Sequence, residues 1–127
     1  ADDFVVTGFV PDITPYFTGC RVSIAPLRYG AGVKGKINLA MSYGLPVVAT
    51  TPSVEGMSLV AERDVVVADR AEDFAQAIAR VYRDAALWER LAEGGRENIR
   101  AYFSRDVARG AITRLIAFAR GNDRRAA

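Results

Sequence analysis

Histidine is absent from the 127 residues, and cysteine occurs only once. Without an imidazole the chain has no histidine general base, no Ser-His-Asp triad and no mixed Cys/His zinc site. The lone Cys20 cannot form an internal disulfide, and it is typical of a small buried hydrophobe in a cytoplasmic protein. We therefore expect a cytoplasmic protein without metal ligands and without a cofactor.

Long apolar runs and a strong charge imbalance are also missing. No segment approaches the length of a membrane span and no signal peptide opens the sequence, so we expect no membrane span. The formal net charge of +2 is too small to argue for nucleic-acid binding. Apolar residues make up 50% of the chain and charged residues 25%, which is typical of one globular domain.

Short apolar runs in the first half predict strands that alternate with helices. The runs are continuous rather than alternating, which is typical of a parallel sheet covered by helices on both faces. Helical spacing appears between them at 13–20 and at 34–43, where Gly44 is a suitable helix stop. The predicted strands are Phe4–Gly8, Val22–Ala25, Pro46–Ala49 and Val65–Ala68.

From Ala71 onward the pattern is helical only. Amphipathic stripes run through 74–82, 87–99 and 107–118, and Gly94-Gly95 predicts a bend within the second. We therefore expect an α/β fold: a Rossmann-like, mainly parallel sheet of about four strands, flanked by helices, with a helical C-terminal third. The domain is expected to span residues 1–120, followed by a frayed tail at 121–127.

The segment RYGAGVKGK, residues 28–36, carries the clearest chemical pattern. It joins the carboxyl end of a predicted strand to a predicted helix, where open α/β sheets bind ligands and helix amides can hold phosphate. Three glycines allow unusual backbone conformations, and Lys34 and Lys36 add positive charge. This favours an anion site, above all for a diphosphate. The spacing is neither a Walker A loop nor a GxGxxG motif, so a tight connection with solvated lysines stays open as the alternative.

Four pieces of sequence, in order, carry a resemblance to a known family. They are VTGFVPDITPYF (6–17), VSIAPLRYGAGVKGK (22–36), AMSYGLPVVAT (40–50), and the stretch from Val65 to Ser104 that includes AEGGRENI. Together they cover nearly the whole chain. They resemble the C-terminal domain of group 1 retaining glycosyltransferases, which have the two-domain GT-B fold.

The resemblance implies a partial GT-B C-terminal domain that binds the nucleotide part of a nucleotide-diphosphate sugar. The sugar would pass to an acceptor held by a separate N-terminal domain that this sequence lacks, so the fragment alone is expected to be inactive. No catalytic residue is assigned. The donor-binding candidates are Arg28, Tyr29, Gly30, Ala31, Gly32, Val33, Lys34, Leu39, Thr50 and Thr51.

The sequence departs from the family at two positions. Members commonly carry two glutamates eight residues apart, and the corresponding positions here are Ala31 and Leu39. The second glutamate usually accepts hydrogen bonds from the ribose, so an aliphatic side chain there can cost about 1–3 kcal/mol. Asn38 lies about 100° away on an ideal helix and is a poor substitute.

Two alternatives to donor binding therefore remain. The chain could be a non-catalytic domain of the same fold that has lost its ribose site and serves in association. It could also bind a different phosphate ligand, because a fold does not fix a function.

The resemblance also implies two further strand–helix units before this segment, with an arginine and a lysine for the diphosphate. Without them the strand predicted at Phe4–Thr7 lacks its natural neighbours, and unpaired strands pair with other chains. We expect it either to pair with the strand at Val22 or to exchange into a second protomer, giving a homodimer.

Overall fold

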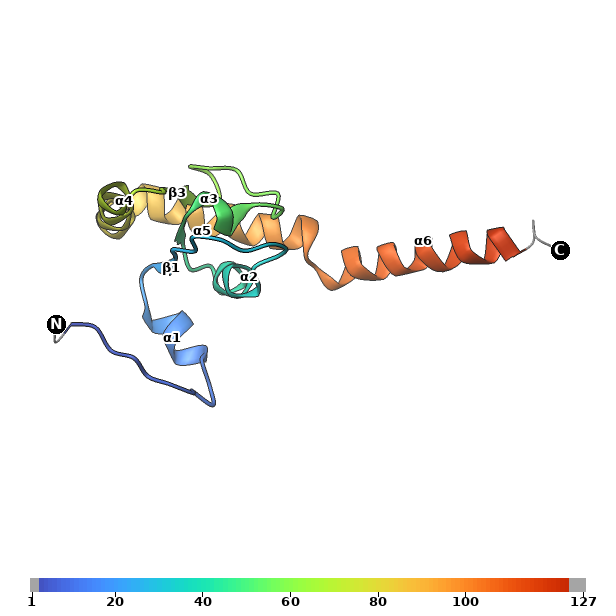
Figure 1. Cartoon of the computed structure of the whole chain (residues 1–127), viewed down its shortest axis with the longest axis horizontal. Coiled ribbons are helices and arrows are strands. Elements are labelled where there is room, and N and C mark those ends of the chain that lie inside the picture. The colour runs from blue at the N-terminus through green and yellow to red at the C-terminus, as the bar shows by residue number, and fades with distance from the viewer. Residues whose placement is uncertain (1–2, 124–127) are drawn as a thin grey trace.

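A three-stranded parallel sheet lies at the centre of the computed structural model, which describes residues 3–123 (Figure 1). The strands β1 (Ser23–Ala25), β2 (Val47–Ala49) and β3 (Val66–Val67) lie side by side in that order. In this register Ile24 lies opposite Val48. The predicted α/β class and three of the four predicted strands are thus confirmed.

Helices occupy most of the remaining described residues. In chain order they are α1 (Thr14–Gly19), α2 (Gly35–Ser42), α3 (Thr51–Val54), α4 (Ala71–Arg83), α5 (Ala85–Tyr102) and α6 (Arg105–Asp123).

The two faces of the sheet are covered by different helices. On one face Val47 and Ala49 are fully buried against Ile37 and Met41 of α2. On the other face Val48 and Val66 pack against Ala77 and Val81 of α4 and against the first half of α5. The continuous apolar runs follow from this arrangement, because neighbouring residues of a strand point to opposite faces and helices cover both faces.

Local signals at the ends of the helices agree with the observed boundaries. The Asp84 carboxylate accepts a hydrogen bond from the Leu87 N–H at 3.0 Å and so caps α5. Helix α4 has acidic residues in its first turn and Arg80 and Arg83 in its last, which matches the helix dipole. Gly44, with φ 71°, takes the left-handed conformation that follows α2.

The Gly94-Gly95 pair does not bend α5, so that prediction is wrong. Helix α5 continues through both glycines. A Cβ atom at Gly94 would lie 2.3 Å from the Arg63 carbonyl oxygen, and one at Gly95 would lie 3.0 Å from Cγ of Met41. The glycines therefore allow close packing of α5 on α2 and on the loop before β3.

Residues 3–13 form no strand, and the expected pairing of Phe4–Thr7 with β1 inside the chain is wrong. Phe4 and Val6 are about four-fifths exposed, and the segment runs below the domain, away from the sheet (Figure 1). Helix α1 is held by Phe17, whose ring stacks on Tyr43 with 5.4 Å between the centroids. The local sequence favours a strand, but a strand forms only beside a partner.

Cys20 is exposed, so its predicted burial is also wrong. It directly follows α1, and α1 itself contains no buried residue. Among residues 3–123 the surroundings of Cys20 leave the thiol exposed, although the residue type by itself favours burial.

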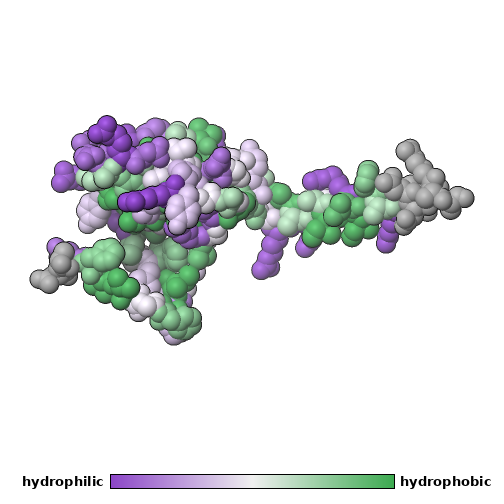
Figure 2. All heavy atoms as spheres, viewed as in Figure 1, coloured by the Kyte–Doolittle hydropathy of each residue, from purple (hydrophilic) through white to green (hydrophobic). Residues whose placement is uncertain are grey.

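Helix α6 confirms the third helical stripe but projects from the rest of the chain (Figure 1). Its apolar residues remain exposed along the helix, as Figure 2 shows. The helix runs to Asp123 and so includes the first residues of the predicted tail, while 124–127 lie outside the described residues. Among the described helices, none has the length and apolar content needed to cross a membrane.

Candidate functional site

A cleft of about 630 Å³ opens at the carboxyl edge of the sheet, on the side of α4. A smaller recess of about 250 Å³ shares Arg28, Thr50 and Asp69 with it. The carboxyl edge is the usual ligand site of open α/β sheets. The residues that line the cleft are Pro26, Arg28, Thr50, Asp69, Ala71, Phe74, Ala75 and Ile78.

Thr50 shapes the floor of this cleft. Its hydroxyl donates to the Leu27 carbonyl oxygen at 2.5 Å, and the Ser53 hydroxyl donates to the Ala25 carbonyl oxygen at 2.6 Å. These two hydrogen bonds, the second of them buried, fasten the end of β1 and the residues after it to the start of α3. Because the Thr50 proton is used inside the protein, this residue positions the loop after β1 rather than offering a free donor.

Asp69 stands at the mouth of the cleft and is held by Thr51. The Thr51 backbone N–H and hydroxyl each donate to one carboxylate oxygen of Asp69, both at 2.7 Å. These hydrogen bonds, the backbone one first, hold the pKa of Asp69 below its ordinary value. The carboxylate is therefore ionised at neutral pH and keeps lone pairs for hydroxyl groups of a ligand.

Asp69 is absent from the donor-binding residues predicted from sequence. A signal for it was available, because it comes immediately after the apolar run Val65–Ala68 and so at the carboxyl end of a strand.

The glycine-containing loop lies between this cleft and α2. Gly30 and Gly32 have φ angles of 150° and 75°, in the region that favours glycine. Lys34, the residue before α2, is only 7% exposed, and its ammonium nitrogen is buried without a hydrogen-bond partner. Its Cε lies 3.9 Å from the place where a Gly30 Cβ would be. A buried ammonium therefore sits beside the loop at the N-terminus of a helix.

The basic residues of this region have no acidic partners. Within residues 3–123 the ion pairs use arginines between Arg63 and Arg109, and none involves Arg28, Lys34 or Lys36. The positive charge at the loop is thus available to an anion.

The predicted donor-binding residues do not all lie together: some line the cleft and others lie outside it. Arg28 and Thr50 line the cleft, and Thr51 holds Asp69 beside it. Lys34 lies within the loop outside the lining, and the loop residues from 29 to 33 are exposed. Leu39 is half-buried on α2 and does not line the cleft.

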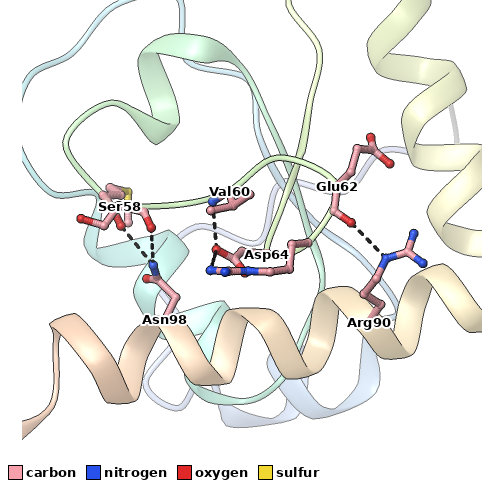
Figure 3. A network of polar contacts seen from close by, with 8 residues as sticks. Ser58, Val60, Glu62, Asp64, Arg90 and Asn98 are labelled. Atoms are coloured by element: carbon pink, nitrogen blue, oxygen red, sulfur yellow. Dashed lines mark hydrogen bonds and ion pairs between the residues drawn. The ribbon is translucent and has the colours of Figure 1, made fainter.

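The loop between α3 and β3 is fastened to α5 (Figure 3). The Asn98 amide nitrogen donates to the Ser58 carbonyl oxygen at 2.8 Å, and Arg90 donates to the Glu62 carbonyl oxygen at 3.0 Å. Asp64, fully buried, accepts from the Val60 N–H at 2.9 Å. These bonds hold a loop in which Ser58 and Glu62 have positive φ. Helix α5 thereby fixes the loop that leads into β3 and on to Asp69.

No group of three possible metal-ligating side chains occurs within the part of the chain that the structure describes.

The family described as "Glycosyl transferases group 1" matches residues 1–84. No curated protein sequence matches the chain.

Two solved structures show the same fold. The C-terminal domain of a group 1 family glycosyl transferase (LpcC) from Francisella tularensis is similar with a TM-score of 0.67 and 14% identity over 77% of this chain. The sucrose-phosphate synthase of Thermosynechococcus elongatus is similar with a TM-score of 0.69 and 24% identity over 84% of this chain. The chain spans 52% of the first solved chain, which is itself a C-terminal domain, and 28% of the second. The family match extends over both the glycine-containing loop and the strands that carry the cleft, and it shows that the chain belongs to the group 1 glycosyltransferases.

Proposed function

We propose that this chain binds the nucleotide-diphosphate part of an activated sugar as the donor-binding segment of a glycosyltransferase. The buried ammonium of Lys34 is the observation that carries the proposal. An unpaired charge in the protein interior is costly, and a bound anion would offset that cost. Arg28 at the cleft and the amides at the start of α2 add to the attraction for a diphosphate.

The charges of the cleft suggest how a donor would lie. The diphosphate would face the loop with Lys34, because Asp69 and the acidic first turn of α4 repel anions on the other side. The hydroxyl groups of the ribose or sugar would face Asp69, which accepts hydrogen bonds. Asp69 would thus serve in place of the family's glutamate, whose position is occupied by Leu39.

The transfer step would need more chain than the part described here. We propose that the sugar passes to an acceptor held by a separate N-terminal domain, as the resemblance implies. Helices and strands of this segment would then position the donor, while the segment alone would not transfer a sugar.

Calorimetric titration with UDP and GDP tests the anion site. We expect Lys34→Ala to weaken binding about ten- to a hundredfold, since hydrogen bonds to charged groups contribute about 1.5–3 kcal/mol. Leu39→Glu should leave binding unchanged, because Leu39 does not line the cleft and Asp69 accepts the hydroxyl groups in the proposed orientation. Arg114→Ala, on the distant helix α6, is the matched control for loss of one positive charge.

Asp69→Asn tests the orientation. It should weaken binding of UDP but not of inorganic pyrophosphate, which has no hydroxyl groups to donate. Equal effects on both ligands would contradict the proposed orientation. If none of the variants or the parent chain binds a nucleotide, donor binding is wrong and the association domain becomes the better hypothesis.

A further inference from the structure

Two polar side-chain atoms at the start of α2 are buried without a hydrogen-bond partner. They are the ammonium nitrogen of Lys34 and the amide oxygen of Asn38, and within residues 3–123 the amide oxygen of Asn98 is the only other such atom. The Asn38 N–H donates to the Lys34 carbonyl oxygen at 3.3 Å, so the two residues are one helical turn apart. Residues four apart lie on the same side of a helix, so the two side chains are neighbours.

Other buried polar side chains of the chain find partners. The hydroxyl groups of Thr50 and Ser53 each donate to a backbone carbonyl oxygen, and Asn98 donates through its amide nitrogen to the loop after α3. A buried polar atom without a partner is unfavourable and is rare in folded proteins. Two such atoms on one turn of a helix, Lys34 and Asn38, therefore indicate a site that a ligand completes.

The two atoms need opposite groups from that ligand. The ammonium of Lys34 only donates hydrogen bonds, and the amide oxygen of Asn38 only accepts them. A diphosphate ester at neutral pH offers acceptors alone, whereas the hydroxyl groups of a sugar also donate. A sugar attached to a phosphate carries both kinds of group next to each other.

We propose that Asn38 contacts the transferred sugar of the donor. Its amide oxygen accepts a hydrogen bond from a sugar hydroxyl group, and Lys34 binds the phosphate next to that sugar. This inference rests on the proposed function, in which Asp69 accepts hydrogen bonds from the ribose. Asn38 as a whole is only half-buried, and Gly30 of the exposed loop lies against the Lys34 side chain, so a ligand that reaches the pair would displace this loop.

The arrangement of the helices favours the sugar over the ribose at Asn38. Asp69 lines the cleft on the side of α4, whereas α2 packs on the opposite face of the sheet. Ribose and sugar are attached to opposite ends of the diphosphate in a nucleotide-diphosphate sugar. A donor with its ribose at Asp69 and its diphosphate at Lys34 therefore directs its sugar toward Asn38.

Calorimetric titration of the chain with sugar nucleotides and with the free nucleotides tests the proposal. The ligands are UDP-glucose, UDP-N-acetylglucosamine and GDP-mannose, each compared with UDP or GDP. We expect Asn38→Leu to weaken binding of the preferred sugar nucleotide about tenfold and to leave binding of its free nucleotide unchanged. Lys34→Ala should weaken both ligands alike. Gln76→Leu removes an exposed amide on α4 and is the matched control, which should change neither.

A second variant separates contact from loss of structure. Asn38→Asp keeps an acceptor oxygen, so the ratio of the two affinities should stay near that of the parent, even though the added charge weakens both ligands. The circular dichroism of both variants should match the parent, because the Asn38 amide oxygen has no partner within the chain.

Two results would overturn the sugar contact and leave nucleotide binding intact. Equal weakening of sugar nucleotide and free nucleotide in Asn38→Leu would mean that Asn38 supports Lys34 or the diphosphate instead. Unchanged binding of every ligand would mean that the amide oxygen does not face the donor. A parent chain that binds none of the nucleotides gives a different result, because it contradicts the proposed function and the sugar contact together.

Discussion

Gly94 shows at the scale of one residue how α5 approaches the loop before β3. A methyl group there would lie 2.3 Å from the Arg63 carbonyl oxygen and 2.7 Å from an Asp64 carboxylate oxygen. Neither atom can move freely, since one is backbone and the other belongs to a fully buried side chain. We expect Gly94→Ala to lower the free energy of unfolding by roughly 1–3 kcal/mol, measured by urea denaturation.

Gly110→Ala is the matched control within another helix. Its Cβ would meet only the flexible end of Arg114, at 3.4 Å. Alanine has the higher helix propensity, so this change should raise the helicity of α6 without loss of stability. Equal destabilisation by both substitutions would mean that the close contact at Gly94 is not the cause of the loss of stability in Gly94→Ala.

The hydrogen bonds from Thr51 determine how Asp69 titrates. They lower its pKa in the folded chain from the ordinary value of 3.8. The stabilisation is therefore fully present above the unfolded pKa and is lost as the pH falls through the lowered folded pKa. Thr51→Val removes the hydroxyl donor but keeps the N–H, so the pKa of Asp69 should rise part of the way back.

An NMR titration of the Asp69 carboxyl carbon measures this directly. Thr14→Val is the matched control, because Thr14 lowers the pKa of Asp12 in the same manner. That variant should shift Asp12 and leave Asp69 unchanged. If Thr51→Val leaves the midpoint of Asp69 in place, the hydroxyl bond does not form in solution.

At the scale of elements, the strands that were predictable are those with neighbours in this chain. The runs at Val22, Pro46 and Val65 form β1, β2 and β3 because each is buried on at least one side by helices nearby in sequence. The run at Phe4 has the same local character but forms no strand, since pairing depends on a partner that the local sequence does not specify. The local sequence therefore predicts which residues favour a strand, but it does not predict which strands pair.

The candidate site was predictable in the same partial way. The loop after β1 was found because glycines and lysines stand where a strand meets a helix. Asp69 was missed because its closeness to Arg28 depends on the order of the strands, which places the ends of β1 and β3 around one cleft. Gly94-Gly95 was misinterpreted for a similar reason, as the contact with Arg63 is invisible in a helix taken alone.

Helix α6 contrasts with α5 in what supports it. Helix α5 contains six buried residues, whereas the described side chains of α6 include none. Helices without tertiary packing are only marginally stable in water. In dilute solution we expect amides of α6 to exchange with solvent about a hundredfold or more faster than those in the middle of α5. Hydrogen exchange followed by mass spectrometry resolves the two helices, and equal protection would show that α6 is covered in solution.

At the scale of the whole molecule, stability should depend on concentration. Within the described residues the sheet has three short strands, and Phe4, Val5 and Val6 lie exposed outside it. If two copies associate through Phe4–Thr7, as the sequence predicts, association and folding are linked, and mass action raises the apparent stability as the concentration rises. A purely monomeric chain has no such dependence.

We therefore expect the unfolding temperature of the parent chain to rise over an approximately hundredfold increase in protein concentration. Val6→Lys should remove the dependence and leave the chain at the lower temperature, because Val6 is exposed and the substitution acts on association and not on the core. Ile112→Lys, at an exposed apolar position of α6, is the matched control and should keep the dependence. A temperature that stays constant in the parent would mean that the chain does not associate through Phe4–Thr7. The three strands and their helices would then be sufficient to hold the cleft without a partner.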